Sequence, residues 1–76
     1  MKDVLELIIT NLVDDKDSVS IEELDEEKSV TYKVKVAKDD MGKVIGKQGR
    51  VARSIRTVMK SVSSKEGKKV NVEFVD

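Results

Sequence analysis

The sequence predicts a small α+β domain with the element order helix–strand–strand–helix–helix–strand. Two observations lead to this prediction: apolar residues alternate with polar residues in three segments, and in three others they recur every three or four positions. Each clear strand has one apolar and one polar face, so we expect a three-stranded sheet with all helices packed on one side. Because the chain has only 76 residues, we expect one domain over residues 1–76.

The amino-terminal half contains a predicted helix and a predicted hairpin. Over residues 3–13 the apolar spacing is that of an amphipathic helix, which a polar, acidic cluster then ends. Residues 19–22 alternate as a half-buried strand does, and Leu24 falls out of phase, which favours a bulge or a strand end there. After a polar turn at 25–28, residues 30–36 alternate with a period of two. We expect the two strands to pair antiparallel.

The carboxyl-terminal half predicts two helices and a last strand. Asp39 or Asp40 can cap a short helix, and a longer helix is predicted over about residues 50–64. Gly67 is a suitable carboxyl cap for this longer helix. Residues 70–75 alternate again and form the last predicted strand.

The composition excludes several classes of function. The chain has no Cys and no His, which rules out thiolate nucleophiles, a Ser-His-Asp triad and the usual zinc ligand sets. The acidic clusters lack the glycine and the spacing of a calcium loop, so we interpret them as solvated turns rather than metal-binding or catalytic carboxylates. We therefore expect neither enzymatic activity nor a metal or cofactor. Apolar runs are short and the start is acidic, so we expect a cytoplasmic protein without a membrane segment.

The zero net charge of the chain hides an asymmetry. Residues 1–40 carry a net charge of −6, whereas residues 41–69 carry +8. Charge segregated in this way can bind a polyanion locally although the protein as a whole is not basic. Ordinary solvated faces are the alternative, and charge alone does not decide between them.

A loop of two glycines around two polar residues, Gly46–Gly49, joins the last two predicted helices. Glycine supplies the positive φ angles of a sharp turn and removes side chains that would keep a phosphate away from the backbone. The unpaired N–H groups and the dipole of the following helix form an anion site. Lys47 stands at the loop tip, flanked by Lys43, Arg50 and Arg53. A helix cap with two convenient glycines is the alternative; the basic helix and the element order favour a loop that contacts phosphates and does not read bases.

The segment Val44-Ile45-Gly46-Lys47-Gln48-Gly49 is similar to the Ile-Gly-x-x-Gly signature of KH domains, and the element order resembles their type II arrangement. Residues 40–50, 56–58 and 66–70 closely resemble the small single-domain bacterial KH RNA-binding proteins, so the resemblance covers nearly the whole chain. It implies that the loop clamps about four nucleotides of single-stranded RNA while an apolar groove floor reads the bases. An RNA chaperone or a post-transcriptional regulator is the implied role.

The resemblance also implies which residues form the RNA site. The four loop residues would be the clamp, Ile45 would belong to the groove wall, and Arg50 and Arg53 would hold phosphates. The predicted RNA-binding residues are Lys43, Ile45, Gly46, Lys47, Gln48, Gly49, Arg50 and Arg53. We interpret four further basic residues as solvated faces of the sheet and the helix: Lys33, Lys35, Arg56 and Lys60.

Two rival functions are weighed against RNA binding. Residues 42–48 resemble a nucleotide-binding P-loop, but only three residues separate the glycines, and Gln48 stands where Ser or Thr would hold magnesium. The stronger rival is a protein-interaction module. The resemblance implies partners, because small bacterial KH proteins are associated with a larger Jag-like KH protein and can form homodimers. The two functions do not exclude each other, and the out-of-phase Val75 is a minor hint of an exposed apolar residue.

The few aromatic residues bear on the kind of nucleic-acid binding. Only Tyr32 and Phe74 are aromatic, and both lie in the apolar phase of a predicted strand, so we expect both in the core. Proteins that stack bases on exposed aromatic side chains are therefore poor matches for this chain.

Overall fold

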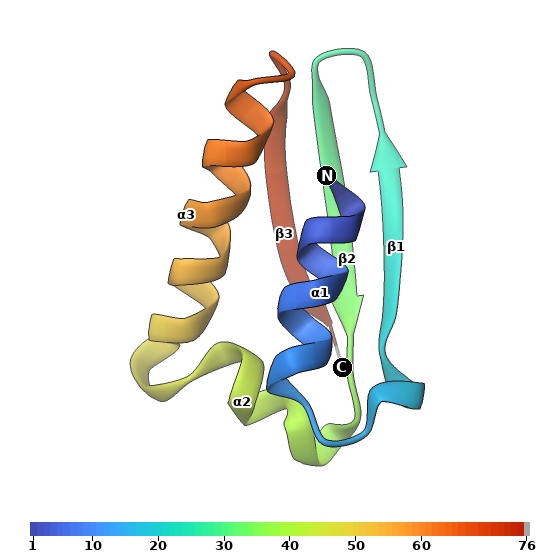
Figure 1. The fold of residues 1–76 in the computed structure, drawn as a ribbon, viewed down its shortest axis with the longest axis vertical. Helices are drawn as coiled ribbons and strands as arrows, with labels where there is room; N and C mark the ends of the chain where they lie inside the picture. Colours follow the sequence, from blue (N-terminus) through green and yellow to red (C-terminus); the bar gives the residue numbers. More distant parts are fainter. Residues whose placement is uncertain (76) are drawn as a thin grey trace.

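The computed structural model describes residues 1–75 and shows the predicted order of helices and strands, with the helices on one face of a single sheet (Figure 1). The helices are α1 (Lys2–Leu12), α2 (Met41–Ile45) and α3 (Arg50–Ser64), and the strands are β1 (Ser20–Asp25), β2 (Ser29–Lys35) and β3 (Lys69–Val75). Short 3₁₀ turns lie at Lys16–Ser18, Lys38–Asp40 and Lys47–Gly49. This α+β architecture is the one that the sequence predicts.

Strand β2 lies in the centre of the sheet, between β1 and β3. It pairs antiparallel with β1, which confirms the predicted hairpin, and parallel with β3. Parallel neighbours need a long crossover connection, and residues 36–68, which contain α2 and α3, provide it. The crossover packs α3 beside β3, so one edge of β3 faces α3 rather than another strand (Figure 1).

The core lies between the sheet and the helices. Every second residue of β2 points into it, and Tyr32 is 2% exposed, as the alternation predicts. The residues of this single cluster are Leu5, Ile9, Val13, Val30, Tyr32, Val34, Val36, Val44, Ile55, Met59 and Val72. Burial of a side chain of this size stabilises a domain by about 1.5–3 kcal/mol. Phe74, also predicted in the core, is only half-buried, since it lies on the edge strand.

The prediction of a bulge or strand end at Leu24 is wrong. Strand β1 continues to Asp25 in regular register, and Leu24 pairs with Thr31. Because opposite residues share a face, Leu24 lies on the side of the sheet away from the helices, where it is 40% exposed. An apolar residue on the solvent side of an edge strand, rather than an irregular backbone, breaks the alternation.

Helix α3 has the bounds that the sequence predicts, and its end shows why. The amide of Lys68 donates to the carbonyl of Ser63 at 3.4 Å, across Gly67 at φ 71°. This is the closure that a glycine in the left-handed region allows after a helix. With 15 residues α3 is the longest helix, and within residues 1–75 no helix is long and apolar enough to cross a membrane.

Candidate nucleic-acid interface

Gly46 ends α2 in a conformation that only glycine adopts readily. Its φ and ψ are 76° and 173°, and its amide donates to the carbonyl of Gly42 at 2.8 Å. A Cβ at this position would lie 2.8 Å from the Cβ and 2.9 Å from the amide nitrogen of Val51, closer than atoms can approach. Gly46 therefore lets the end of α2 rest directly on the first turn of α3.

The rest of the loop turns through left-handed backbone. Gln48 has φ 58° and ψ 25°, and Gly49 has φ 75° and ψ 16°. The amide of Gly49 donates to the carbonyl of Gly46 at 3.1 Å, which closes the turn. A non-glycine residue in the left-handed region costs about 1–3 kcal/mol, and such strain is concentrated at functional sites. Lys47 and Gln48, both exposed, form the tip of this closed turn.

The amino terminus of α3 opens directly at the loop. Gly49 is the N-cap residue, no side chain caps the helix, and its first turn contains no acidic residue. The amide of Arg50 already donates to the carbonyl of Lys47, and the amide of Val51 packs against Gly46. The dipole of α3 and the flanking cations, rather than free amides, favour an anion at this end. Lys47, Arg50 and Arg53 are exposed, and within residues 1–75 none of the three forms an ion pair. The structure brings these predicted site residues together around one helix end.

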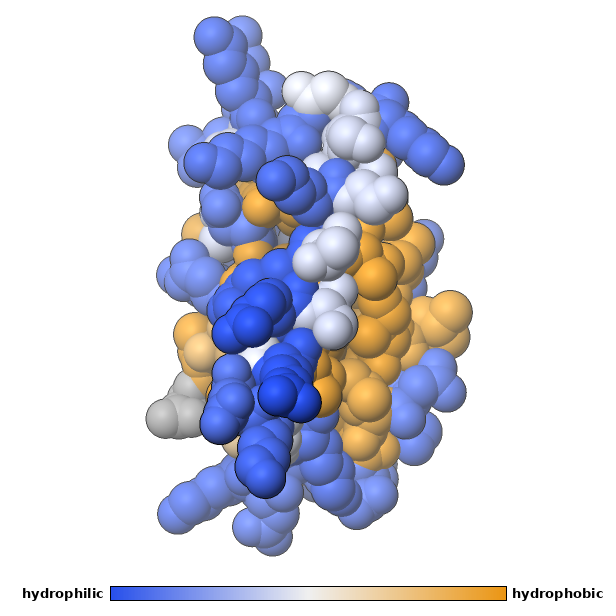
Figure 2. All heavy atoms as spheres, turned by 90° about the vertical axis from the view of Figure 1, so that its left-hand side faces the viewer, coloured by the Kyte–Doolittle hydropathy of each residue, from blue (hydrophilic) through white to orange (hydrophobic). Residues whose placement is uncertain are grey.

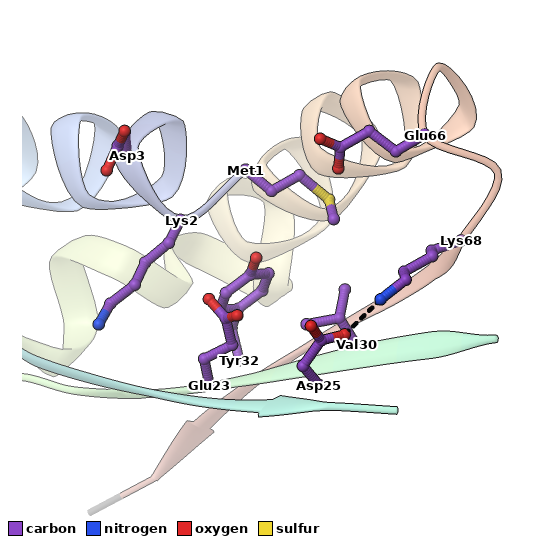
Figure 3. A pocket seen from close by; sticks show the side chains of 9 residues that line it. All are labelled: Met1, Lys2, Asp3, Glu23, Asp25, Val30, Tyr32, Glu66 and Lys68. Atoms are coloured by element: carbon purple, nitrogen blue, oxygen red, sulfur yellow. Dashed lines mark hydrogen bonds and ion pairs between the residues drawn. The ribbon is translucent and has the colours of Figure 1, made fainter. Parts of the chain in front are cut away.

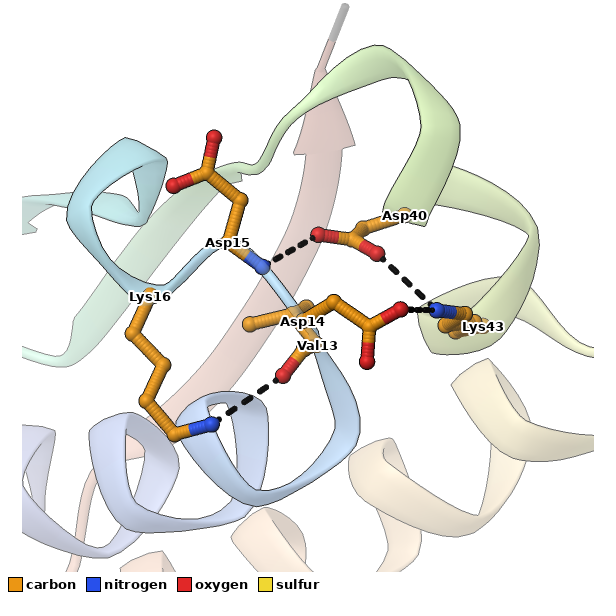
Figure 4. Close-up of polar contacts among 6 residues, drawn as sticks. All are labelled: Val13, Asp14, Asp15, Lys16, Asp40 and Lys43. Atoms are coloured by element: carbon orange, nitrogen blue, oxygen red, sulfur yellow. Dashed lines mark hydrogen bonds and ion pairs between the residues drawn. The ribbon is translucent and has the colours of Figure 1, made fainter.

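Lys43, by contrast, is held by two carboxylates (Figure 4). Its Nζ donates to Asp14 and lies 3.2 Å from Asp40 Oδ1. The hydrogen bond to Asp14, followed by the one to Asp40, raises the pKa of the Lys43 ammonium. Lys43 thus ties α2 to the segment after α1, and its charge is already matched within the fold.

Asp40 occupies the N-cap position of α2, but its side chain does not cap that helix as predicted. Instead Asp40 Oδ2 accepts a hydrogen bond from the backbone amide of Asp15 at 3.0 Å (Figure 4). The Asp40 side chain is almost fully buried, and the hydrogen bond from Asp15 is the main cause that lowers its pKa. The carboxylate therefore joins two segments 25 residues apart.

Of the basic residues interpreted as solvated, Arg56 is exposed as predicted, but it also contacts β3. Its Nε donates to the carbonyl of Val72 on β3 at 3.1 Å, and its guanidinium carbon lies 5.7 Å from the centre of the Phe74 ring. Arg56 thus lies against β3 at the side of the groove, a placement that helical periodicity alone cannot reveal. Lys33 lies on the outer face of the sheet, with Glu22 and Glu73 at the neighbouring register positions.

Helix α3 separates two kinds of surface (Figure 2). A pale row of weakly polar side chains runs along it, with strongly hydrophilic residues on one side and a broad apolar band on the other. The three arginines of the chain all belong to α3: Arg50, Arg53 and Arg56. Ile45 is half-buried and packs against the core at the end of α2, where it supports the loop.

A larger pocket lies at the other end of α3, away from the loop (Figure 3). Its volume is about 630 Å³, and its charged lining residues are Lys2, Asp3, Glu23, Asp25, Glu66 and Lys68. Lys68 is paired with Asp25 at 2.5 Å. Burial first, and then carboxylates led by Glu23, raises the pKa of Tyr32 to about 12. This pocket has an excess of negative charge and does not suit a polyanion.

Within residues 1–75 no group of three or more carboxylates is placed to hold a metal ion.

The sheet with helices on one face and the glycine loop between α2 and α3 together define a type II KH domain. The family model for the KhpA/KhpB KH domain matches residues 2–74. A protein of Clostridium acetobutylicum named RNA-binding protein KhpA is 52% identical over 75 residues, which cover 99% of this chain and 100% of that protein. Proteins of the same name from Aquifex aeolicus and Chlamydia caviae are 43% and 45% identical over 76 residues, which cover 100% of this chain and 96% and 97% of those proteins. The chain belongs to the KhpA/KhpB KH-domain family.

The contact between Gly46 and Val51 leads to a first prediction. Gly46→Ala should lower the free energy of unfolding by at least about 1–3 kcal/mol, because the backbone conformation is nearly closed to other residues and the added Cβ meets Val51. Gly42→Ala is the matched control. No atom lies within 4 Å of a Cβ there, and Ala within α2 should stabilise the protein by about 0.4–1 kcal/mol. Urea unfolding of both variants tests this; equal effects would show that Gly46 is not constrained.

The Asp40 contacts lead to a prediction about pH. Because the folded-state pKa of Asp40 is lowered, its stabilising effect is complete above the ordinary Asp pKa of about 3.9 and is lost as the pH falls below that value. The free energy of unfolding should therefore fall more steeply between about pH 5 and pH 3 in the wild type than in Asp40→Asn. Asp39→Asn, at the exposed neighbouring residue, should keep the wild-type slope. Identical slopes for all three proteins would contradict the prediction.

Proposed function

We propose that this chain binds single-stranded RNA by holding the backbone of about four nucleotides at the loop and at the first turn of α3. The observation that supports this most is that three exposed cations, Lys47, Arg50 and Arg53, gather at the amino terminus of α3, where no side chain caps the helix and no acidic residue lies in the first turn. The relatives named RNA-binding protein KhpA support RNA as the polyanion.

The four loop residues contribute in different ways to the proposed clamp. Gly49 leaves open space beside the turn, since no atom lies within 4 Å of the position that a Cβ there would occupy, so a phosphate can approach closely. Gly46 contributes instead by packing against Val51, which fixes the shape of the turn. Lys47 and Gln48 point away from the fold and can close over the bound strand. Arg50 and Arg53 follow along α3 and offer their forked guanidinium groups to the next phosphates. Ile45 packs against the core and so supports the loop from inside the fold. Lys43 stabilises the position of α2 through its ion pairs rather than by binding a phosphate directly.

A clamp that contacts the backbone accepts many sequences, because phosphates carry no base information. A site for about four nucleotides also offers few contacts, so we expect a dissociation constant on the order of micromolar. Broad, weak binding of this kind suits an RNA chaperone or a post-transcriptional regulator in the cytoplasm, and we propose this role rather than an enzymatic one.

The clamp predicts that Lys47→Asp/Gln48→Asp abolishes binding to a short single-stranded RNA, since both changes place negative charge where phosphates would lie. The fold should persist, because both residues are exposed and Asp tolerates the left-handed backbone of Gln48. Lys28→Asp/Lys65→Gln makes the same change in net charge away from the loop and should bind RNA like the wild type. Fluorescence anisotropy with a labelled hexanucleotide measures all three, and unchanged affinity in the loop variant would refute the clamp.

The salt dependence of binding provides a further check on the same samples. Neutralisation of about three phosphates on a single strand predicts a log–log slope of roughly −2 for the wild type. A slope near zero would mean that phosphate contacts do not provide the affinity and would favour a protein as the ligand.

We also propose a second function, pairing with another KH domain, because α1 and α3 expose a continuous apolar face. Leu7 is 64% and Val58 44% exposed, although the surface around them is rich in charge. Val58 borders a shallow hollow of about 260 Å³ with an almost wholly apolar lining that includes Ile8, Leu12 and Val51. This is the apolar band beside the pale row in Figure 2. A second copy of this chain is the proposed occupant, since a two-fold axis makes such a face complementary to itself.

Pairing would join two weak RNA sites into one bivalent binder with higher avidity. The family model names the KH domains of two proteins, KhpA and KhpB, which supports a KH domain as the occupant; a larger Jag-like KH protein is the alternative. Val51, in the first turn of α3, lines the hollow, but at about 100° per residue Arg53 lies on the other side of the helix from Val51 and Val58. Pairing through the apolar face would therefore leave Arg53 open to RNA.

The pairing proposal predicts that the wild type sediments as a dimer at high micromolar concentration and that Val58→Glu is a monomer with the same far-ultraviolet circular dichroism. Leu24→Glu is the matched control, because Leu24 is exposed to a similar degree on the opposite side of the sheet and should remain dimeric. A wild type that stays monomeric at all concentrations would contradict homodimer formation.

A further inference from the structure

The guanidinium of Arg56 is fixed in place by two contacts with β3. Its Nε donates to the carbonyl of Val72 at 3.1 Å, and its plane lies by the Phe74 ring, 5.7 Å from the ring centre. An arginine has five N–H donors, and only the one on Nε is used here. The two Nη groups therefore form a pre-oriented fork with four free N–H donors among the described residues.

This fork borders a hollow between α3 and the free edge of β3. The hollow has a volume of about 310 Å³ and is lined by Arg56, Lys60, Val70, Asn71, Val72 and Glu73. Because the Val72 carbonyl accepts from Arg56 on α3, it faces away from β2. The carbonyls of Val70 and Phe74 alternate in step with it and face the same edge. The hollow thus presents donors from α3 and acceptors from β3.

The hollow lies within reach of a strand held at the loop. Arg56 follows Gly49 by seven positions, which is about 10 Å along the helix axis. If the phosphates of a strand lie at the loop and the first turn of α3, its bases can extend along α3 toward the hollow beside β3. A clamp for about four nucleotides is long enough to place one base beside Arg56.

The chemistry of the hollow fits a base edge better than a phosphate. Arg56 and Lys60 would attract a phosphate in the hollow, but the Glu73 carboxylate and the carbonyls at the free edge of β3 would repel it. A guanine offers O6 and N7 acceptors, which match the fork of an arginine in a bidentate pair. Adenine places an amino donor where guanine has O6, so it opposes the same fork.

We propose that Arg56 is a specificity-determining residue that reads one guanine in the bound RNA. This inference rests on the proposed RNA-binding function and adds base selection to a clamp that otherwise contacts only the backbone. The Val72 carbonyl and the Phe74 ring act as positioning groups that hold the fork in the orientation for O6 and N7.

The experiment scans one guanine through every position of a labelled hexauridine and measures affinity by fluorescence anisotropy. At one position the wild type should prefer guanine over adenine by about tenfold, the scale of one bidentate pair. At that position 7-deazaguanine, which lacks the N7 acceptor, should lose most of this preference. This arm needs no protein variant, so it does not depend on whether an Arg56 variant folds.

Arg56→Lys keeps the charge but removes the fork, so the preference for guanine over adenine should disappear. The affinity for the hexauridine that carries adenine at the same position should stay within about twofold of the wild-type value. Lys28→Arg, in the turn between β1 and β2 and away from the proposed site, should change neither the affinity nor the preference. If the wild type binds every hexamer equally, the inference is wrong although the clamp stands; if it binds none, the clamp itself is wrong. If Arg56→Lys weakens all hexamers alike and flattens the salt slope, Arg56 holds a phosphate, which also overturns the inference.

Discussion

The candidate site depends on the close approach of Gly46 to Val51. With no Cβ between them, the end of α2 rests on the first turn of α3, and the chain reverses within the two polar residues of the loop. The turn that this contact allows places the exposed Lys47 next to the amino terminus of α3, which no side chain caps. Packing behind the loop, from Val44 in the core and from half-buried Ile45, makes the arrangement rigid. A strained Gln48 can then be tolerated, because the surrounding structure determines its backbone.

Basic residues that are close together in the sequence have different degrees of freedom in the fold. Lys43 is neutralised by Asp14 and Asp40, Arg50 and Arg53 are free at the surface, and Arg56 is anchored on β3. A side chain without a partner can adjust to phosphates at different positions. A side chain that is hydrogen-bonded to the backbone, as Arg56 is, presents its remaining donors in a fixed direction. For the proposed RNA binding, the way in which each charge is held would therefore matter more than the number of positive charges in the segment.

The elements and the loop were predictable because their signals are local. The period of the apolar residues, the glycine pair and Gly67 each act within a few positions, and the bounds of α3 follow from them. The features that the sequence did not predict are contacts between distant segments. Asp40 bonds to Asp15 rather than to its own helix, and Arg56 reaches Val72, 16 positions away. Leu24 interrupts the strand pattern because it lies on the solvent side of the edge strand β1. The burial and the hydrogen-bond partners of such residues depend on how whole helices and strands pack together. The periodicity of the sequence carries no information on that packing.

The acidic pocket and the basic loop lie at opposite ends of α3, so these two sites present unlike local charge. The pocket carries Asp3, Glu23, Asp25 and Glu66, whereas three unpaired cations among the described residues lie at the loop. Salt screens charges that are more than about 10 Å apart at 0.1 M, so each site acts on a charged molecule only at close range. A polyanion close to the loop would therefore be attracted although the chain has no net charge, and one close to the pocket would be repelled.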